Sequence, residues 1–126
     1  YWIKSVKKTT IIRDKLMTDE VRKIYQNKDI LFSNYTIFYP NTILKPHKDP
    51  NILRYPYRRI QIPLVVPDTR KCYMEWVDIK GGISMWEEGK PQICDVMRYT
   101  HQAYNYSDKP LEILFVDIKH DTEVEL

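Results

Sequence analysis

Short segments in which apolar and polar residues alternate recur along this chain, and they restrict it to a β-rich fold. The clearest lies between residues 58 and 67, where Ile60 and Ile62 alternate with Arg59 and Gln61. Successive side chains of a strand point to opposite faces, so this alternation predicts a strand with one apolar face. The chain also contains 8 Pro and little helical periodicity, which agrees with a β domain of limited helix.

Strand-like segments make up most of the remaining sequence. We predict strands over residues 30–39, 42–49, 58–67, 71–77, 83–86, 92–94, 98–105 and 111–119, with a turn at Pro40 and Asn41. About eight short strands joined by polar turns are typical of a two-sheet jelly roll. We therefore expect a mainly β fold whose two sheets leave a cavity between them for a metal.

One segment near the N-terminus has helical periodicity instead. Thr18 suits the N-cap position of a helix. Val21, Ile24 and Tyr25 then follow at the i, i+3 and i+4 positions of one apolar helical face. This pattern predicts one short helix that runs through about Asn27.

The bulk composition limits the classes of function. A chain of 126 residues forms one domain, here taken as residues 1–126. Its net charge of +3 and the absence of a long basic run give no electrostatic reason to expect nucleic acid binding. No apolar run reaches the length of a membrane span, and no signal peptide is found. The chain begins at Tyr1 and not at Met, which is consistent with a fragment of a longer protein.

Cys72 and Cys94 are the two cysteines, and both lie in strand-like segments. We interpret them as buried free thiols, in preference to a disulfide or a metal site. That interpretation fits a reducing compartment, so we expect a soluble, cytoplasmic protein.

Three residues supply a candidate metal site. His47 and Asp49 are separated by one residue, and His101 follows much later. Residues i and i+2 of a strand share a face, so the first two side chains are expected to point the same way. Two imidazoles and one carboxylate are the ligands of a facial-triad iron(II) site. Taken alone the His-x-Asp pair is a weak pattern, and a surface histidine near a carboxylate is the alternative.

Arg59 and Gln61 share the strand face opposite Ile60 and Ile62. If the apolar face packs into the domain, the polar face points either to solvent or into a polar cavity. Beside a metal in such a cavity, a guanidinium would bind a carboxylate, because its planar fork matches two oxygens.

Four blocks of sequence together resemble the aspartyl/asparaginyl β-hydroxylase family. They are Tyr35-Thr36-Ile37 through Pro46-His47, then Arg59-Ile60-Gln61-Ile62-Pro63-Leu64, then Trp86-Glu87-Glu88-Gly89-Lys90 ending in Asp95, and last His101 with Asn105, Ser107-Asp108 and Pro110. The blocks cover residues 35–120, and the third is the most specific. The resemblance implies an iron(II)- and 2-oxoglutarate-dependent oxygenase on a double-stranded β-helix, a cupin-like jelly roll, here with one N-terminal helix.

The resemblance also assigns roles by position. It implies that His47 and His101 bind iron. Thr36 falls where the family has a hydroxyl residue near the distal carboxylate of 2-oxoglutarate, and Arg59 falls on an arginine that contacts the cosubstrate. Gln61 stands where some members have a cosubstrate-contacting histidine, so its transfer is weaker.

This chain departs from the family pattern at two positions. Asp49 stands where some members have Gly and bind iron through two histidines, so it restores the general facial triad. Leu111 stands where the family has an arginine that pairs with the distal carboxylate of 2-oxoglutarate. Lys109 is the local substitute, although a lysine is a point charge without a fork, and the alternative is a solvated turn lysine.

From these residues we expect a dioxygenase that hydroxylates a peptidyl or small-molecule side chain. The alternatives are a cupin-like metal-binding domain without 2-oxoglutarate turnover, and a metal enzyme in which Arg59 receives a substrate carboxylate directly. We also expect Trp86 in the core and Gly89 in a turn. Asp95 is expected to cap a turn or to support a ligand histidine, His120 to be solvated, and residues 54–58 to form a loop at the mouth of the site.

Overall fold

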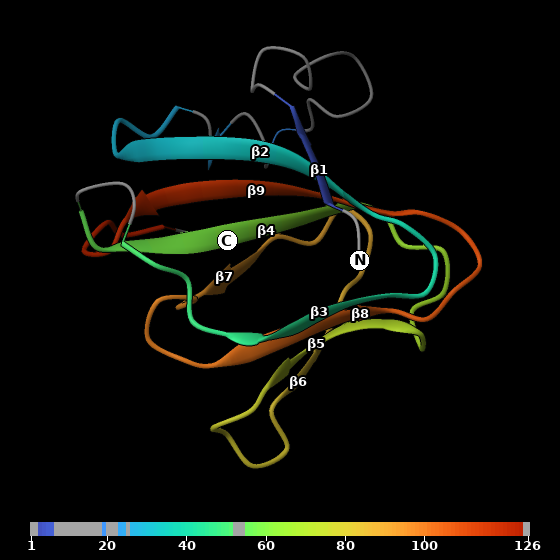
Figure 1. The fold of residues 1–126 in the computed structure, drawn as a ribbon. Coiled ribbons are helices and arrows are strands. Elements are labelled where there is room, and N and C mark those ends of the chain that lie inside the picture. The colour runs from blue at the N-terminus through green and yellow to red at the C-terminus, as the bar shows by residue number, and fades with distance from the viewer. Residues whose placement is uncertain (1–2, 7–18, 20–22, 25, 52–54, 125–126) are drawn as a thin grey trace.

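The computed structural model describes residues 3–6, 19, 23–24, 26–51 and 55–124. Two antiparallel sheets face each other across the core, as predicted for a jelly roll (Figure 1). The larger sheet has the strand order β1-β2-β9-β4-β7, and the smaller has the order β3-β8-β5-β6. The strands are β1 (Ile3–Val6), β2 (Ile30–Phe38), β3 (Thr42–His47), β4 (Tyr57–Val65), β5 (Cys72–Trp76), β6 (Ile83–Met85), β7 (Gln92–Cys94), β8 (His101–Asn105) and β9 (Leu111–Lys119).

The predicted strands are all present, and β7 and β9 have the predicted bounds. β8 begins later than predicted, because Arg98 and Tyr99 donate main-chain hydrogen bonds to the Asp95 carbonyl and form a turn before the strand. Asn41 has the positive φ of 57° that the predicted turn requires. β1 was not predicted, and it pairs antiparallel with β2.

Most of the helix predicted from Thr18 through about Asn27 lies outside the described residues, and no helix is bounded among those that are described. Ile24, on its predicted apolar face, is buried. No helix in the described part of the chain is long and apolar enough to cross a membrane.

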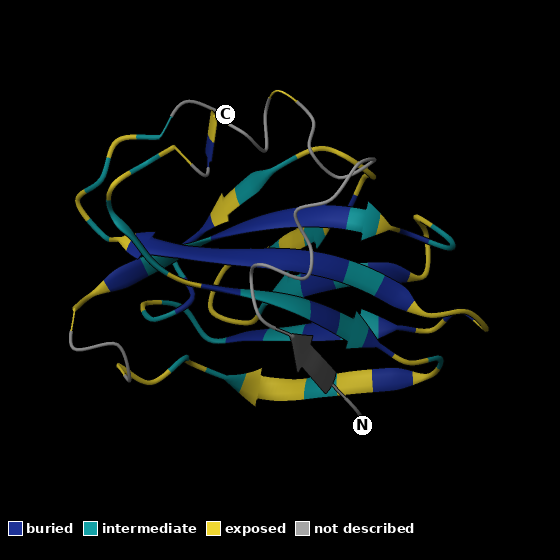
Figure 2. Ribbon diagram, turned by 90° about the horizontal axis from the view of Figure 1, so that it is seen from above, coloured by how far each residue is buried: buried dark blue, intermediate teal, exposed yellow. Residues whose placement is uncertain are grey.

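The core has two apolar layers, and Figure 2 shows the buried residues concentrated along the central strands. One layer fills the space between the sheets and consists of Phe38, Val66, Cys72, Met74, Trp86, Ala103, Leu111, Ile113 and Phe115. The other covers the outer face of the larger sheet and consists of Ile24, Ile60, Ile62, Leu114, Val116 and Ile118. The central strand β9 contributes alternate residues to both layers, which explains its nearly continuous apolar sequence.

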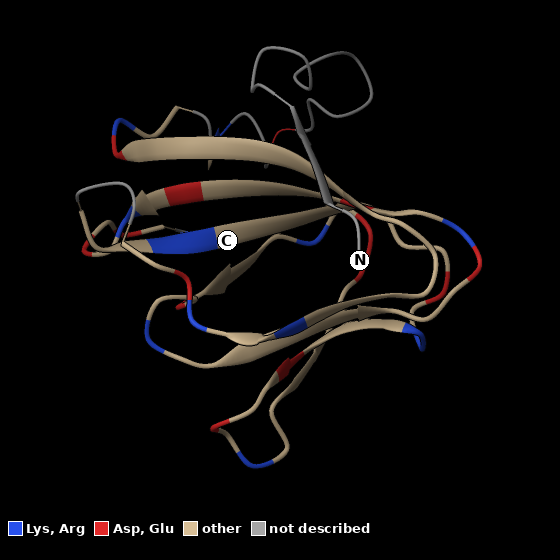
Figure 3. Cartoon of the chain, in the orientation of Figure 1, with Lys and Arg blue, Asp and Glu red and all other residues tan. Residues whose placement is uncertain are grey.

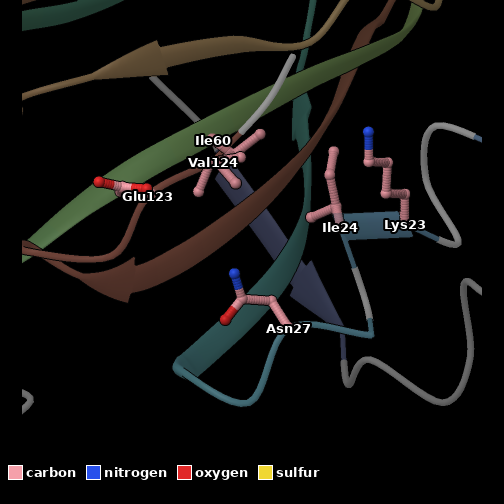
Figure 4. A pocket seen from close by; sticks show the side chains of 6 residues that line it. All are labelled: Lys23, Ile24, Asn27, Ile60, Glu123 and Val124. Carbon is pink, nitrogen blue, oxygen red and sulfur yellow. The ribbon is translucent and has the colours of Figure 1, made fainter.

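The apolar face of β4 is buried in the second apolar layer, on the side of the sheet that points away from the other sheet. Ile60 lines a cavity of about 470 Å³ on the outer face of the larger sheet (Figure 4). Arg59 and Gln61 therefore point between the sheets, and the Gln61 side chain is buried there. Solvent and the interior were the two surroundings considered for these side chains, and in the structure they face the interior.

Cys72 and Cys94 are buried free thiols, as predicted. Trp86 is fully buried in the core. Gly89 has a φ of 75° in a turn, and its amide donates a hydrogen bond to the Pro63 carbonyl. These three predictions are confirmed.

Candidate metal centre between the sheets

A β-bulge brings His47 to the inner face of the smaller sheet. Thr42 and Leu44 pair with Asn105 and Ala103, and the register then shifts so that His47 pairs with His101. Without the extra residue, strict alternation would turn His47 outward together with Ile43. Bulges of this kind redirect side chains beside functional sites.

Asp49 reaches the same place by another route than the one predicted. β3 ends at His47, so the two side chains do not meet by strand alternation. Instead the Asp49 amide donates a hydrogen bond to the Val96 carbonyl at 2.9 Å, which holds the loop after β3 beside the turn before β8. The predicted convergence is therefore present, but a bulge and a loop produce it.

The three predicted ligands are gathered in one place. Asp49 Oδ1 is 3.2 Å from His47 Nε2 and 3.1 Å from His101 Nε2. The candidate ligand atoms all lie within 4.8 Å of one another. The side chains of His101 and Asp49 are buried, whereas the His47 side chain is 35% exposed, so the site opens to solvent beside His47.

Main-chain carbonyls determine which imidazole nitrogen is available in each ring. His47 Nδ1 lies 2.7 Å from the Lys45 carbonyl oxygen, and His101 Nδ1 lies 2.9 Å from the Tyr99 carbonyl oxygen. A carbonyl accepts hydrogen bonds only, so each Nδ1 carries the proton and each Nε2 presents a lone pair. Ligand histidines in metal sites are commonly held by this second hydrogen bond.

Asp49 Oδ1 is buried, and none of the residues that the structure describes donates a hydrogen bond to it. It faces two imidazole lone pairs, and such a buried acceptor is costly unless a cation or proton joins the three atoms. The charge of the Arg59 guanidinium beside Asp49 Oδ2 favours the ionised carboxylate. The donor set therefore fits a divalent cation held by two neutral imidazoles and an ionised carboxylate.

Arg59 holds the other oxygen of Asp49. Its Nη1 donates to Asp49 Oδ2 at 2.9 Å, while Nε and Nη2 donate to Asp117 Oδ1 and Oδ2 at 2.8 and 3.2 Å. Figure 3 shows the basic band of β4 beside the acidic band of β9. Burial lowers the pKa of Arg59, but the hydrogen bond and charge of Asp117 and the charge of Asp49 raise it above its usual value. The guanidinium therefore stays charged.

An aromatic wall adjoins the three ligands. Trp76 is the register partner of His101, and the two ring centroids are 5.4 Å apart. Tyr99 packs edge-on against Trp76. A cavity of about 220 Å³ begins behind this wall and is lined by Trp76, Ile79, Ser84, Gln92, Ile93, Cys94, Asp95 and Tyr99. Cys94 is in turn the register partner of Arg59, so two of the cavity's lining residues, Trp76 and Cys94, neighbour residues of the site.

Of the residues predicted to contact the cosubstrate, Arg59 and Gln61 share the inner face of β4, whereas Thr36 and Lys109 lie on other segments. Thr36 is buried on β2, opposite Ile113. Gln61 accepts a hydrogen bond from the Trp86 indole at 2.9 Å, and its own amide lies 2.9 Å from Met74 Sδ. Lys109 is exposed in the turn between β8 and β9, at the opposite end of β8 from His101.

The remaining expectations were met in part. The His120 side chain is 42% exposed, as expected, and its Nε2 also lies 3.0 Å from Asp95 Oδ2. Asp95 caps the turn before β8 through its carbonyl. Its carboxylate contacts neither ligand histidine, since both Nδ1 atoms bond to main-chain carbonyls. Of the loop at 54–58, Tyr55 is exposed, whereas Tyr57 is buried and Arg54 lies outside the described residues.

Sequence analysis missed Asp117 and Trp76. Asp117 is the one charged residue in the apolar run from 113 to 118, and a charge in a strand buried on both faces is the signal that was available. Trp76 carried no signal, because tryptophan is common in cores.

Two sequence comparisons cover most of the chain. A sequence model of the aspartyl/asparaginyl β-hydroxylase family matches residues 6–121. The ornithine lipid ester-linked acyl 2-hydroxylase of Rhizobium tropici is 34% identical over 85 residues, which are 66% of this chain and 27% of that protein. The chain thus spans about a quarter of the length of that relative.

Solved structures share the fold at low sequence identity. The cupin domain of an XRE-family transcriptional regulator from Enterobacter cloacae has a TM-score of 0.55 and 10% identity, with 97% of each chain covered. A double-stranded β-helix protein from Klebsiella pneumoniae has a TM-score of 0.53 and 12% identity, with 77% of this chain and 73% of that chain covered. These similarities establish a cupin-like jelly roll, and they carry no information about activity.

Proposed function

Because the chain belongs to the aspartyl/asparaginyl β-hydroxylase family, we propose that it is an iron(II)- and 2-oxoglutarate-dependent dioxygenase that hydroxylates a peptidyl or small-molecule side chain. One observation carries this proposal. The buried Asp49 Oδ1, which has no donor among the described residues, lies 3.1–3.2 Å from the free Nε2 atoms of His47 and His101. Two imidazoles and a carboxylate on one side of an ion are the facial ligand set of non-haem iron(II) oxygenases.

In this proposal the bound iron supplies the oxygen chemistry, and the protein supplies ligands, orientation and exclusion of water. His47, Asp49 and His101 hold the metal. The Lys45 and Tyr99 carbonyls keep both imidazoles in the tautomer that presents Nε2. Trp76 lies against His101 on one side of the site, and the edge of His47 is exposed to solvent.

The cosubstrate would bind beside Arg59. Its contacts with Asp117 and Asp49 use one N–H of each terminal nitrogen, so each retains a second N–H for a carboxylate of 2-oxoglutarate. Thr36 and Gln61 would contact the cosubstrate deeper between the sheets, as the family pattern implies. Lys109 is a candidate for the distal carboxylate only if the turn that carries it folds inward.

The substrate would approach through the 220 Å³ cavity beside Trp76. Its walls combine Ile79, Ile93 and the two aromatic rings with the polar side chains of Ser84, Gln92 and Asp95, so they suit a largely apolar group that carries a polar end. An acyl chain is the small-molecule group that this lining favours, and the Rhizobium tropici relative is named for an acyl chain of a lipid. A peptidyl side chain remains the other class.

A second function, a metal-binding domain without 2-oxoglutarate turnover, is supported by Leu111. This residue is fully buried among Phe38, Ile113 and Trp86, where the family has a carboxylate-binding arginine. A distal carboxylate placed in that apolar layer would lack a partner, at a cost of several kcal/mol.

Anaerobic titration of the iron(II) protein with 2-oxoglutarate tests these functions. The oxygenase should develop a visible metal-to-ligand charge-transfer band and, on admission of oxygen, should form succinate. Iron binding with neither band nor succinate would favour the binding domain. Absence of iron binding would reject both functions.

A further inference from the structure

Arg59 divides its hydrogen bonds unequally between two carboxylates. Two of its nitrogens form a fork with Asp117, whereas Asp49 receives only Nη1, on Oδ2. A guanidinium and a carboxylate pair most strongly through such a fork. The carboxylate that receives the fork has both of its oxygens hydrogen-bonded to Arg59. The division therefore decides whether Asp49 Oδ1 stays available to a metal.

Asp117 is placed to receive the fork. It is the register partner of Arg59 across β4 and β9, and it is 2% exposed. Its neighbours on the inner row of β9, Ile113 and Phe115, are apolar, and Arg59 Cζ lies 4.6 Å from the centre of the Phe115 ring. A carboxylate buried in such surroundings needs a charged partner, and Arg59 supplies it.

We propose that Asp117 is a positioning residue for the metal centre, which acts by keeping the Arg59 fork away from Asp49. The proposal rests on the metal site of the preceding section. With the fork on Asp117, Asp49 Oδ1 remains directed at His47 and His101. Without the negative charge of Asp117, Arg59 would close a fork on Asp49 and occupy Oδ1, and a metal would have to displace that ion pair.

A purely structural role for Asp117 makes a different prediction. In that case its loss would lower the stability of the fold but leave the metal affinity of the folded protein unchanged. Metal affinity in the absence of cosubstrate therefore separates the two roles, and it does not depend on turnover.

The test is calorimetric titration of Asp117→Asn with Co(II), without 2-oxoglutarate, together with the visible spectrum of bound Co(II). We expect Co(II) to bind at least about tenfold more weakly, equivalent to about 1.4 kcal/mol, with shifted visible bands. Asp108→Asn is the matched control, because Asp108 is exposed in the turn between β8 and β9. It should bind Co(II) with wild-type affinity and an unchanged spectrum.

Arg59→Lys provides the second arm, since lysine keeps the charge but lacks the fork. In this background Asp117→Asn should change Co(II) affinity by less than about threefold. An equal loss in both backgrounds, or wild-type affinity of the folded Asp117→Asn protein, would overturn the inference. If Asp117→Asn does not fold, Arg59→Lys alone decides: affinity within about threefold of wild type supports the inference, and a tenfold loss overturns it.

The Co(II) titration of the wild-type protein separates a failure of the proposed function from a failure of the inference about Asp117. Failure of the wild-type protein to bind Co(II) would remove both the proposed function and this inference. Wild-type binding that Asp117→Asn leaves unchanged would remove the inference alone.

Discussion

Trp76 and His101 are register partners on β5 and β8, and their ring centroids lie 5.4 Å apart. This proximity makes the indole a reporter for the proposed metal site. Co(II) or iron(II) bound at His101 should quench the fluorescence of Trp76. Trp76→Phe should remove most of this metal-dependent change while metal still binds in calorimetry. Trp86→Phe, at the fully buried indole of the core, should retain the change, and the opposite pattern would contradict the placement of the metal.

Asp49 is expected to be a true ligand. Asp49→Ala removes the carboxylate that contacts both imidazoles, so metal affinity should fall by at least about tenfold. Calorimetry with Co(II) measures this, and Asp108→Ala is a matched control at an exposed carboxylate. Equal affinity and equal turnover of Asp49→Ala and wild type would show that this chain works with two histidines alone.

Leu111→Arg tests whether the family arginine can be restored. If only the missing fork mattered, Leu111→Arg would leave the use of 2-oxoglutarate unchanged or improve it, but Leu111 is fully buried among apolar side chains. A charge there without a partner should lower the free energy of unfolding by about 3–5 kcal/mol. Urea unfolding measures the loss, with Leu111→Met as the volume-matched control. Undiminished stability would mean that the interior can hydrate or pair the guanidinium.

Cys94 should resist alkylation in the folded protein. Burial raises the pKa of Cys94 to about 12, so almost no thiolate is present at pH 8, and unfolding returns the pKa to about 8.5. Because the unfolded chain loses the thiol proton at a lower pH than the folded protein, the free energy of unfolding should fall as pH rises from the unfolded pKa toward the folded pKa. Below the unfolded pKa this contribution to stability is fully present. Mass spectrometry after iodoacetamide treatment should find Cys94 modified only in denaturant. Modification of the native protein at the unfolded rate would contradict its burial.

Gln61 should contribute to stability through the Trp86 indole. Gln61→Met removes the acceptor at 2.9 Å and leaves a buried N–H without a partner, so the free energy of unfolding should fall by about 1–3 kcal/mol. Trp86→Phe in the same background should recover part of this loss, because it removes the unsatisfied donor. Denaturant unfolding of the single and double variants tests the pair. Additive losses would show that the two side chains are not coupled.

The local sequence predicted the strands well because alternation is a property of each segment by itself. β7 and β9 have their predicted bounds, and the turn at Asn41 follows from a residue that tolerates positive φ. Burial of Trp86 was predicted in the same way. The three candidate ligands were also visible in the sequence, as the pair His47 and Asp49 and the distant His101.

Alternation could not say which face of a strand turns inward. Ile60 and Ile62 seemed to mark the inner face of β4, but a second apolar layer covers them, and Arg59 and Gln61 point between the sheets. The direction of each face depends on what packs against it from distant segments, and a single strand does not contain that information.

The sequence by itself determined the mainly β architecture, most strand bounds and the set of candidate ligands. The tertiary structure alone decided how these ligands meet. A bulge in β3 turns His47 inward, a loop hydrogen bond brings Asp49 to it, and Asp117 holds Arg59 from a neighbouring strand. Each of these depends on the register between strands far apart in the chain, where a shift of one residue reverses the direction of every side chain.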